Sequence, residues 1–374
     1  MTQIHGFVAA GFDGVAEAFR RNFDEHGEVG ASIAAYWRGQ QVVDLWGGQA
    51  DPDAGLAWQQ DTLQLIFSGT KGLLAACVLL LVERGQVDLA APLARYWPEF
   101  GKPAVTVGDV LSHQSRLPGV PGGVTTSDLL DGSAMAKHLA AQEPETDPRA
   151  GFMYHALTYG WLVGELIRRV DGRDAGRFFA DEFARPLRLD IWIGLPDELH
   201  HRSSRTIAGP GVLAPPEPDD PLHRLVRNPL LAADAPDLWN SAAFRRAGMP
   251  AVGAYATARA MARFYGCLAA GGSCDGIRVL AESTIALGRQ EIRRGVEPTW
   301  RAPMAYAAGF ELWTPAAHLG PPRDAFGHAG AGGSRHGAWP ALGVGFSYAM
   351  NQLRADTPDP RPLVLLDALH SAIC

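Results

Sequence analysis

An uninterrupted apolar run from Gly72 to Val82 most constrains how this chain can fold, and Ser68 and Lys71 directly precede it. If the run is a helix, residues three positions apart share one face, so the Ser68 hydroxyl and the Lys71 amine can meet. A serine is a weak nucleophile until a neighbouring base takes its proton. A lysine can be that base only if burial or a nearby cation lowers its pKa. The pattern therefore indicates a candidate nucleophile and base.

The choice of lysine at position 71 supports this interpretation. The chain has only three lysines, Lys71, Lys102 and Lys137, and arginine supplies the rest of its basic charge. Arginine is effectively never deprotonated and could not serve as a base. Ser-x-x-Lys is nevertheless a short pattern, and a chance match is usually a helix start with a solvated lysine. The rest of the sequence must distinguish a catalytic lysine from a solvated lysine at a helix start.

Strand-like segments lie at both ends of the chain, and helical segments lie between them. Residues 11–26 have a helical period, and apolar arms at 31–37 and 42–46 around Arg38-Gly39-Gln40 predict a hairpin. The other predicted elements are helices within 68–202, a loop or lid at 209–229, a helical stretch at 252–270 that starts near Thr257-Ala258-Arg259, strands at 307–313, 325–330 and 343–351, and a final helix at 363–373.

This order predicts an α+β fold in which both chain ends form one antiparallel sheet flanked by helices. The helical segments would form a lobe inserted into it. We expect a single domain over residues 1–374 with two lobes. Residues 1–67 and 240–374 would form the α/β lobe, and residues 68–239 the helical lobe, with a lid-like loop around 203–235.

Composition excludes several classes of protein. The chain has 374 residues and a formal net charge of -7, without a basic stripe that would bind nucleic acid. The apolar run is shorter than the roughly 20 residues that span a bilayer. The first residues show no basic segment leading into an apolar one, so we expect no secretory signal and a cytoplasmic protein. The four cysteines lack metal-binding or redox spacing, and we expect no metal and no cofactor.

Motifs of other enzyme classes do not occur in the sequence. No serine lies in the Gly-x-Ser-x-Gly turn of α/β-hydrolases. There is no His-Glu-x-x-His, no Walker loop, and no Gly-x-Gly-x-x-Gly opening a helix after a strand. Their absence strengthens the interpretation of Ser68 as the nucleophile.

Three blocks of sequence resemble the serine hydrolases of the class C β-lactamase fold, most closely their family VIII carboxylesterase branch. They are Ser68-Gly69-Thr70-Lys71 with the segments 80–89 and 107–118, Tyr154-His155-Ala156, and the run 327–334, Gly-His-Ala-Gly-Ala-Gly-Gly-Ser. The resemblance covers roughly residues 7–351. It implies a β-lactamase or penicillin-binding-protein-like fold and an acyl-enzyme on a serine.

The resemblance also implies roles for particular residues. Ser68 would attack the acyl carbon, and Lys71 or Tyr154 would take its proton; the sequence leaves open which, because the two would titrate as a coupled pair. The backbone N–H groups of Ser68 and Ala331 would form the oxyanion hole. His328 and Gly330 would lie beside the substrate.

Two departures from the lactamase pattern bear on the substrate. Tyr-x-Asn and Lys-Thr-Gly are replaced by Tyr154-His155-Ala156 and His328-Ala329-Gly330. The missing asparagine amide and lysine would hold the side chain and carboxylate of a β-lactam, so a lactamase or D,D-peptidase is disfavoured. Arg335 and His336 follow the glycines and are candidates to contact a polar or anionic substrate, although they could simply be surface groups. Trp239 is a candidate to line an apolar pocket, although core packing is the commoner role.

The sequence therefore predicts a carboxylesterase that acts on a small-molecule ester. A transacylase that passes the acyl group to an amine or alcohol in natural-product biosynthesis is the main alternative. A non-catalytic binding protein that retains the fold is a third, which the intact serine, lysine and tyrosine argue against. The sequence does not indicate an oligomeric state.

Overall fold

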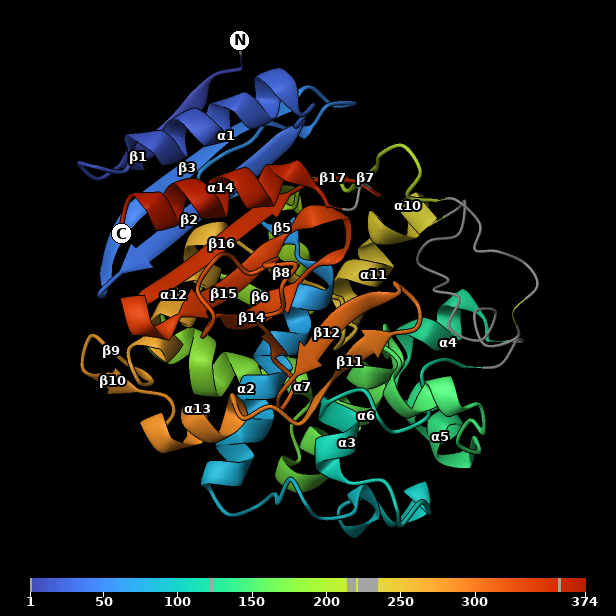
Figure 1. Ribbon diagram of the computed structural model, residues 1–374. Coiled ribbons are helices and arrows are strands. Elements are labelled where there is room, and N and C mark those ends of the chain that lie inside the picture. The colour runs from blue at the N-terminus through green and yellow to red at the C-terminus, as the bar shows by residue number, and fades with distance from the viewer. Residues whose placement is uncertain (1, 121–123, 214–219, 221–234, 356–357) are drawn as a thin grey trace.

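A large antiparallel sheet forms the centre of the structure, a computed structural model that describes residues 2–120, 124–213, 220, 235–355 and 358–374 (Figure 1). In sheet order its strands are β1 (Ile4–Val8), β3 (Gln40–Asp51), β2 (Gly30–Trp37), β16 (Val344–Met350), β15 (Arg335–Trp339), β14 (Phe326–Ala329), β13 (Glu311–Leu312), β12 (Ala302–Tyr306) and β11 (Arg293–Glu297), with β4 (Leu56–Ala57) on β3. β2 pairs with β16, which places Ala35 opposite Phe346. The predicted sheet built from both chain ends is therefore confirmed.

Helices cover both faces of this sheet. α1 (Asp13–Glu25) and α14 (Pro360–Ser371) pack together on one face, and α12 (Ala258–Ala269) packs on β16, β2 and β15 from the other (Figure 1). The approach of α12 depends on a glycine in β16. A Cβ on Gly345 of β16 would lie 2.0 Å from the backbone nitrogen of Gly266 in α12. The helix and strand can pack this closely only because Gly345 has no side chain.

The apolar run near the nucleophile forms α2 (Thr70–Glu83), and every residue from Thr70 to Leu81 is buried. A helix that is hydrophobic on all sides is stable only inside a core. α2 packs against α6, α7, α13 and strand β14. It therefore joins the helical region to the sheet and carries the residues at its start to the junction between them.

The remaining described helices and short strands complete the fold. The helices are α3 (Val107–Leu111), α4 (Thr126–Leu130), α5 (Gly132–Ala141), α6 (Thr158–Asp171), α7 (Ala175–Phe179), α8 (Arg185–Leu187), α10 (Ala235–Trp239), α11 (Ala242–Ala247) and α13 (Glu282–Gly288). The strands are β5 (Gln64–Leu65), β8 (Ala254–Ala256) and β6 (Ile191–Ile193) in one small sheet, β17 (Gln352–Leu353) with β7 (Ile207–Ala208), and β9 (Ser273–Cys274) with β10 (Ile277–Arg278). No helix within the described ranges is both long and apolar enough to cross a membrane.

Sequence predictions need correction or restriction in two stretches and agree with the structure in a third. The strand expected at 307–313 is wrong for its first half, where Ala307 to Gly309 form a turn and only β13 is extended. In the stretch 252–270, the helix α12 begins at Ala258, in agreement with the predicted start near Thr257-Ala258-Arg259, and the residues before it form β8. Within the predicted lid at 203–235, residues 207–208 form β7, while 214–219 and 221–234 lie outside the described residues. The lobe boundaries themselves stay a prediction.

Candidate active site

The nucleophile candidate lies in a tight turn between a strand and a helix. β5 leads into the 3-10 turn η1 (Phe67–Gly69), which continues directly as α2. Phe67 has a φ of 45°, a left-handed conformation that is strained for a residue with a side chain. The Thr70 hydroxyl stabilises this turn, because it donates to the Phe67 carbonyl at 2.6 Å and accepts from the backbone N–H of Ala254 at 3.0 Å. Ser68 therefore lies, half-buried, in a turn that these hydrogen bonds fix.

Lys71 is fully buried, and its amine has three partners. Its Nζ lies 3.1 Å from the Ser68 Oγ, 2.8 Å from the Ala156 carbonyl oxygen and 3.2 Å from the Ala251 carbonyl oxygen. Carbonyl oxygens can only accept hydrogen bonds. A neutral amine at this place would donate its two N–H bonds to the carbonyls and direct its lone pair at the serine hydroxyl. The surroundings therefore orient the amine as a base toward Ser68.

Close packing of a loop against α6 positions the Ala251 carbonyl. A Cβ on Gly160 of α6 would lie 2.2 Å from the backbone nitrogen of Ala251, so the loop touches the helix backbone. Gly253 closes the same loop by donating to the Met249 carbonyl at 2.7 Å. The carbonyl that faces Lys71 is consequently fixed by backbone packing.

Burial shifts the pKa values of the two candidate bases in opposite directions. It lowers the pKa of Lys71 well below its usual range, although the nearby Glu311 carboxylate acts in the opposite direction. Burial also raises the pKa of Tyr154 well above its usual range, despite a hydrogen bond between its hydroxyl and Ser68. Desolvation disfavours the charged form of each group, so both are held neutral. A neutral lysine can accept a proton, whereas a neutral tyrosine can only give one up.

Tyr154 is held from both sides. The buried carboxylate of Glu297 in β11 accepts the Tyr154 backbone N–H at 2.9 Å and the backbone N–H of Trp300 at 2.9 Å. The Trp300 ring lies 4.7 Å from the Tyr154 ring, and the His113 ring lies 4.6 Å from it on another side. The Lys71 Nζ is 4.9 Å from the ring centroid. The phenol is therefore placed beside both Ser68 and Lys71.

His155 anchors the segment that carries Tyr154. Its backbone N–H donates to the His113 Nδ1 at 3.1 Å, and its ring bonds the Ser115 hydroxyl at 2.8 Å and the Met153 carbonyl at 2.6 Å. Burial lowers its pKa to about 4. These contacts give His155 and His113 structural positions.

Strand β14 and the turn after it complete the site. A Cβ on Gly330 would lie 2.4 Å from the carbonyl oxygen of Ile66, so this strand end touches the segment that leads to Ser68. The 3-10 turn η8 (Ala331–Gly333) follows. Ala331 is exposed and is the first residue of the turn, where a backbone N–H has no partner within the helical turn. The Ala331 N–H remains the predicted second donor of the oxyanion hole.

His328 and His336 lie side by side on the sheet face that meets α2. They are directly opposite in the pairing of β14 with β15. A Cβ on Gly69, next to the nucleophile, would lie 2.6 Å from the His336 ring. Burial lowers the pKa of each histidine to about 3, and each ring has an Nε2 with no protein partner among the described residues. His336 is thus a buried neighbour of the nucleophile turn and not a surface group.

Arg335 and Trp239 are the other predicted binding residues. Arg335 is next to His336 in an extended strand, so its side chain points to the opposite sheet face. There its guanidinium donates to the Ser334 carbonyl at 2.8 Å. Trp239 is fully buried with its ring 5.6 Å from that of Phe67. Arg335 and Trp239 remain predictions as substrate-binding residues, and these positions do not support them.

The match to a known family agrees with this geometry, since residues 15–369 match the β-lactamase family. The chain belongs to the β-lactamase family. The curated relatives include the esterase/β-lactamase LipL of Mycobacterium tuberculosis, 35% identical over 98% of this chain and 85% of its own. The resemblance inferred from the three blocks is confirmed.

Solved structures of the β-lactamase family superpose over nearly the whole chain. A family VIII carboxylesterase is 36% identical with a TM-score of 0.91, covering 99% of this chain and 100% of its own. A penicillin-binding-protein homologue from Caulobacter crescentus is 35% identical with a TM-score of 0.91 and the same coverage. EstA from Arthrobacter nitroguajacolicus is 29% identical with a TM-score of 0.85, covering 100% of this chain and 98% of its own.

Several residues of this β-lactamase-family site escaped the sequence reasoning. Thr70, Ala251, Glu297 and Glu311 all lie next to the candidate catalytic groups or their supporting segments. Glu311 is buried, its carboxylate accepts the backbone N–H of Ala329 at 3.0 Å, and burial raises its pKa to about 7. A glutamate inside the apolar segment 307–313 was a signal that could have drawn attention to it. Ala251 offered none, because it acts through its backbone carbonyl.

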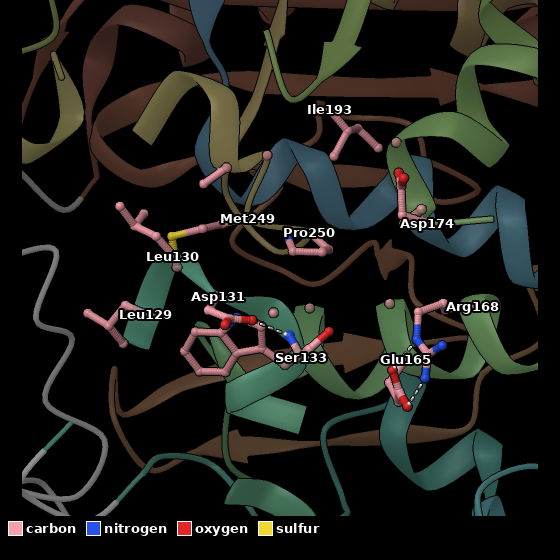
Figure 2. A pocket seen from close by; sticks show the side chains of 18 of the residues that line it. Leu129, Leu130, Asp131, Ser133, Glu165, Arg168, Asp174, Ile193, Met249 and Pro250 are labelled. Atoms are coloured by element: carbon pink, nitrogen blue, oxygen red, sulfur yellow. Dashed lines mark hydrogen bonds and ion pairs between the residues drawn. The ribbon is translucent and has the colours of Figure 1, made fainter. Parts of the chain in front are cut away.

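A separate cavity of about 520 Å³ is lined in part by the residues directly before Ala251 (Figure 2). Pro250 and Met249 line one wall, and the Glu165–Arg168 ion pair lies at another, as Figure 2 shows. The residues that line this cavity do not include Ser68, Lys71 or Tyr154. Among the described residues no cluster of three or more His, Cys, Asp or Glu side chains is arranged to hold a metal ion.

Proposed function

We propose that the protein is a serine carboxylesterase that forms an acyl-enzyme on Ser68 and uses Lys71 as the general base. The observation that carries this proposal is the 3.1 Å contact between a buried lysine amine and the Ser68 hydroxyl. The family VIII carboxylesterase structure and the relative named as an esterase support the same chemistry.

The site residues divide the acylation step between them. Ser68 Oγ bonds to the ester carbonyl carbon while its proton passes to Lys71 Nζ, and the carbonyl electron pair moves to the oxygen. The backbone N–H groups of Ser68 and Ala331 hold that oxyanion. When the carbonyl re-forms, the C–O bond to the alcohol breaks. Tyr154 gives its proton to the departing alkoxide and recovers one from the Lys71 ammonium.

Deacylation repeats these steps with water in place of the alcohol. Lys71 accepts a proton from the attacking water, and Ser68 leaves as the hydroxyl. A buried lysine whose pKa is well below its usual range can accept a proton and give it up again within one turnover. Turnover then releases a carboxylic acid and regenerates the neutral amine.

The missing amide and lysine of the lactamase pattern favour esters over β-lactams. The position of the asparagine is held by Ala156, whose backbone carbonyl accepts from Lys71. The position of the lysine is held by His328, which burial keeps neutral. Neither group supplies a cation for the carboxylate of a β-lactam. We therefore propose that ester hydrolysis exceeds hydrolysis of a chromogenic cephalosporin by orders of magnitude.

An acceptor assay tests the proposal. The wild-type protein and Ser68→Ala are incubated with a nitrophenyl butyrate ester, with and without a panel of amines and alcohols. We expect butyric acid as the product, no change on adding acceptors, and no turnover by Ser68→Ala. Faster formation of an amide or a new ester than of acid would replace this proposal with the transacylase hypothesis.

The cellular location is proposed separately. All four cysteines are free, as is usual in a reducing compartment. We propose the cytoplasm, and a fractionation of cells that express the protein tests it.

A further inference from the structure

A buried arginine that the catalytic scheme does not use packs against the turn that carries Ala331. Arg361 lies in the first turn of α14, where Asp359 caps the helix by accepting the Arg361 backbone N–H at 3.0 Å. The helix start thus directs the guanidinium under the sheet end, where it is fully buried.

All five N–H donors of the guanidinium are used. Nη1 donates to Glu28 at 3.0 Å and to the Gln352 carbonyl at 3.1 Å. Nη2 donates to Asp359 at 2.9 Å and to the Gly332 carbonyl at 2.9 Å. Nε donates to Asp359 at 3.2 Å. A buried charge is tolerated only when it is paired and hydrogen-bonded in this complete way.

The bond to Gly332 joins this cluster to the candidate oxyanion hole. Gly332 is the residue after Ala331, and its φ of 78° puts its peptide in the left-handed region. Its carbonyl accepts from Arg361 and also from the backbone N–H of Arg354 at 3.1 Å. A Cβ on Gly333 would lie 2.5 Å from the Asp359 carboxylate and 2.9 Å from the Arg361 Nη2. The turn therefore rests directly on the ion pair.

We propose that Arg361 is a positioning residue that fixes the orientation of the Ala331 N–H toward the oxyanion. The inference rests on the proposed function, because it assigns a purpose to one part of that site. Arg361 does not touch the substrate and acts through the peptides of η8. Ile66 limits the turn on one side, through its contact with Gly330, and Arg361 limits it on the other.

Lysine cannot replace this arginine in the same geometry. An ammonium has three donors on a single nitrogen, whereas Arg361 reaches acceptors in four separate chain segments. Arg361→Lys keeps the charge but loses the fork, so the Gly332 carbonyl keeps only the Arg354 N–H. We expect the turn to rotate and the Ala331 N–H to lose its alignment.

The experiment compares Arg361→Lys with Arg259→Lys. Arg259 is a control because its Nε pairs with the nearly buried carboxylate of Asp44 at 2.9 Å and the pair lies away from η8. Each protein is titrated with a fluorophosphonate to count active sites. We then measure kcat and KM for the nitrophenyl ester, and the Kd of an alkylboronic acid whose tetrahedral adduct places an oxygen in the oxyanion hole.

We expect Arg361→Lys to lower kcat per active site about 10- to 100-fold, less than the roughly 10²- to 10³-fold loss on removing a whole donor. The boronic acid Kd should rise by a similar factor while KM changes little. Arg259→Lys should lower the melting temperature and leave both values unchanged. An unchanged kcat and boronate Kd in folded Arg361→Lys would overturn the inference.

A second variant keeps the inference testable if Arg361→Lys does not fold. Gly333→Ala pushes the turn away from the same ion pair, and it should raise the boronate Kd without changing KM. An unchanged Kd for folded Gly333→Ala would also overturn the inference. If wild-type Ser68 is not labelled by the fluorophosphonate, the proposed function itself fails, and that result is separate from any effect of Arg361.

Discussion

The Lys71 amine lies between one hydroxyl and two carbonyl oxygens. It can act as a general base toward the hydroxyl only when it has lost its own proton. Lys71→Arg keeps a cation in place but removes the base, because a guanidinium is effectively never deprotonated. We expect kcat/KM for the nitrophenyl ester to fall about 10²- to 10⁴-fold, the range for general-base catalysis. The exposed Lys137→Arg is the matched control and should retain wild-type activity. Activity within a few-fold of wild type in Lys71→Arg would exclude Lys71 as the base.

The pH dependence of kcat/KM follows from the same amine. The base works only when neutral, so the rate should fall as the pH drops through the lowered pKa of Lys71. The Glu311 carboxylate raises that pKa, and Glu311→Gln removes the charge while its amide oxygen can still accept from Ala329. The acid limb of the pH–rate profile should therefore move to lower pH in Glu311→Gln. A limb that stays fixed or moves to higher pH would contradict this electrostatic assignment.

At the scale of elements, the nucleophile turn η1 is positioned by its contact with β15. Gly69→Ala would put a Cβ 2.6 Å from the His336 ring, which is buried and cannot move away freely. Such overpacking typically destabilises by roughly 1–3 kcal/mol. We expect thermal melting to show this loss, together with a lower kcat because Ser68 shifts with the turn. Gly14→Ala in α1, where a Cβ meets nothing within 4 Å, should leave kcat unchanged and should not lower the melting temperature.

The elements that sequence reasoning located well are those with strong local signals. The hairpin around Arg38-Gly39-Gln40 and the helix α12 capped by Thr257 follow from turn and capping residues near in sequence. The stretch 307–313 was predicted as one strand because its composition is apolar. The backbone instead turns in its first half, where Gly309 has a φ of 89°. Short strands such as β8 also escaped, since only their partners β5 and β6 make them strands.

The site residues divide in the same way, into those with a recognisable sequence pattern and those without one. Ser68, Lys71 and Tyr154 were predicted because their side chains form recognisable patterns, and the structure brings all three together. The carbonyls of Ala156 and Ala251 could not be predicted, because any residue can supply a backbone carbonyl. Arg335 was a candidate to contact a substrate, and this role stays a prediction, because the alternation of side chains in β15 gives it a different face from His336.

At the scale of the whole molecule, a buried ionic cluster joins the two ends of the chain. Glu28 follows α1, and it pairs with Arg361 in α14 and accepts a hydrogen bond from Tyr348 in β16. Burial raises the pKa of Glu28 from 4.5 to about 7. The native state therefore binds a proton more tightly than the unfolded chain, and the contribution of Glu28 to stability declines as the pH rises from about 4.5 to about 7.

Glu28→Gln tests this coupling because glutamine does not titrate. A shift from 4.5 to about 7 corresponds to roughly 3 kcal/mol between those two pKa values. The free energy of unfolding of the variant should therefore improve relative to wild type by about that amount between pH 5 and pH 8. Denaturant melts at several pH values measure the difference. A constant difference across this range would show that Glu28 has an ordinary pKa in the folded protein.

The central claim is that Ser68 becomes acylated, and mass mapping of a fluorophosphonate adduct tests it most directly. The account predicts one adduct per chain on the peptide that contains Ser68, and none on Ser68→Ala. Labelling should slow strongly in Lys71→Arg and remain normal in Lys137→Arg. An adduct on another serine, or an active esterase with Ser68 unmodified, would contradict the account.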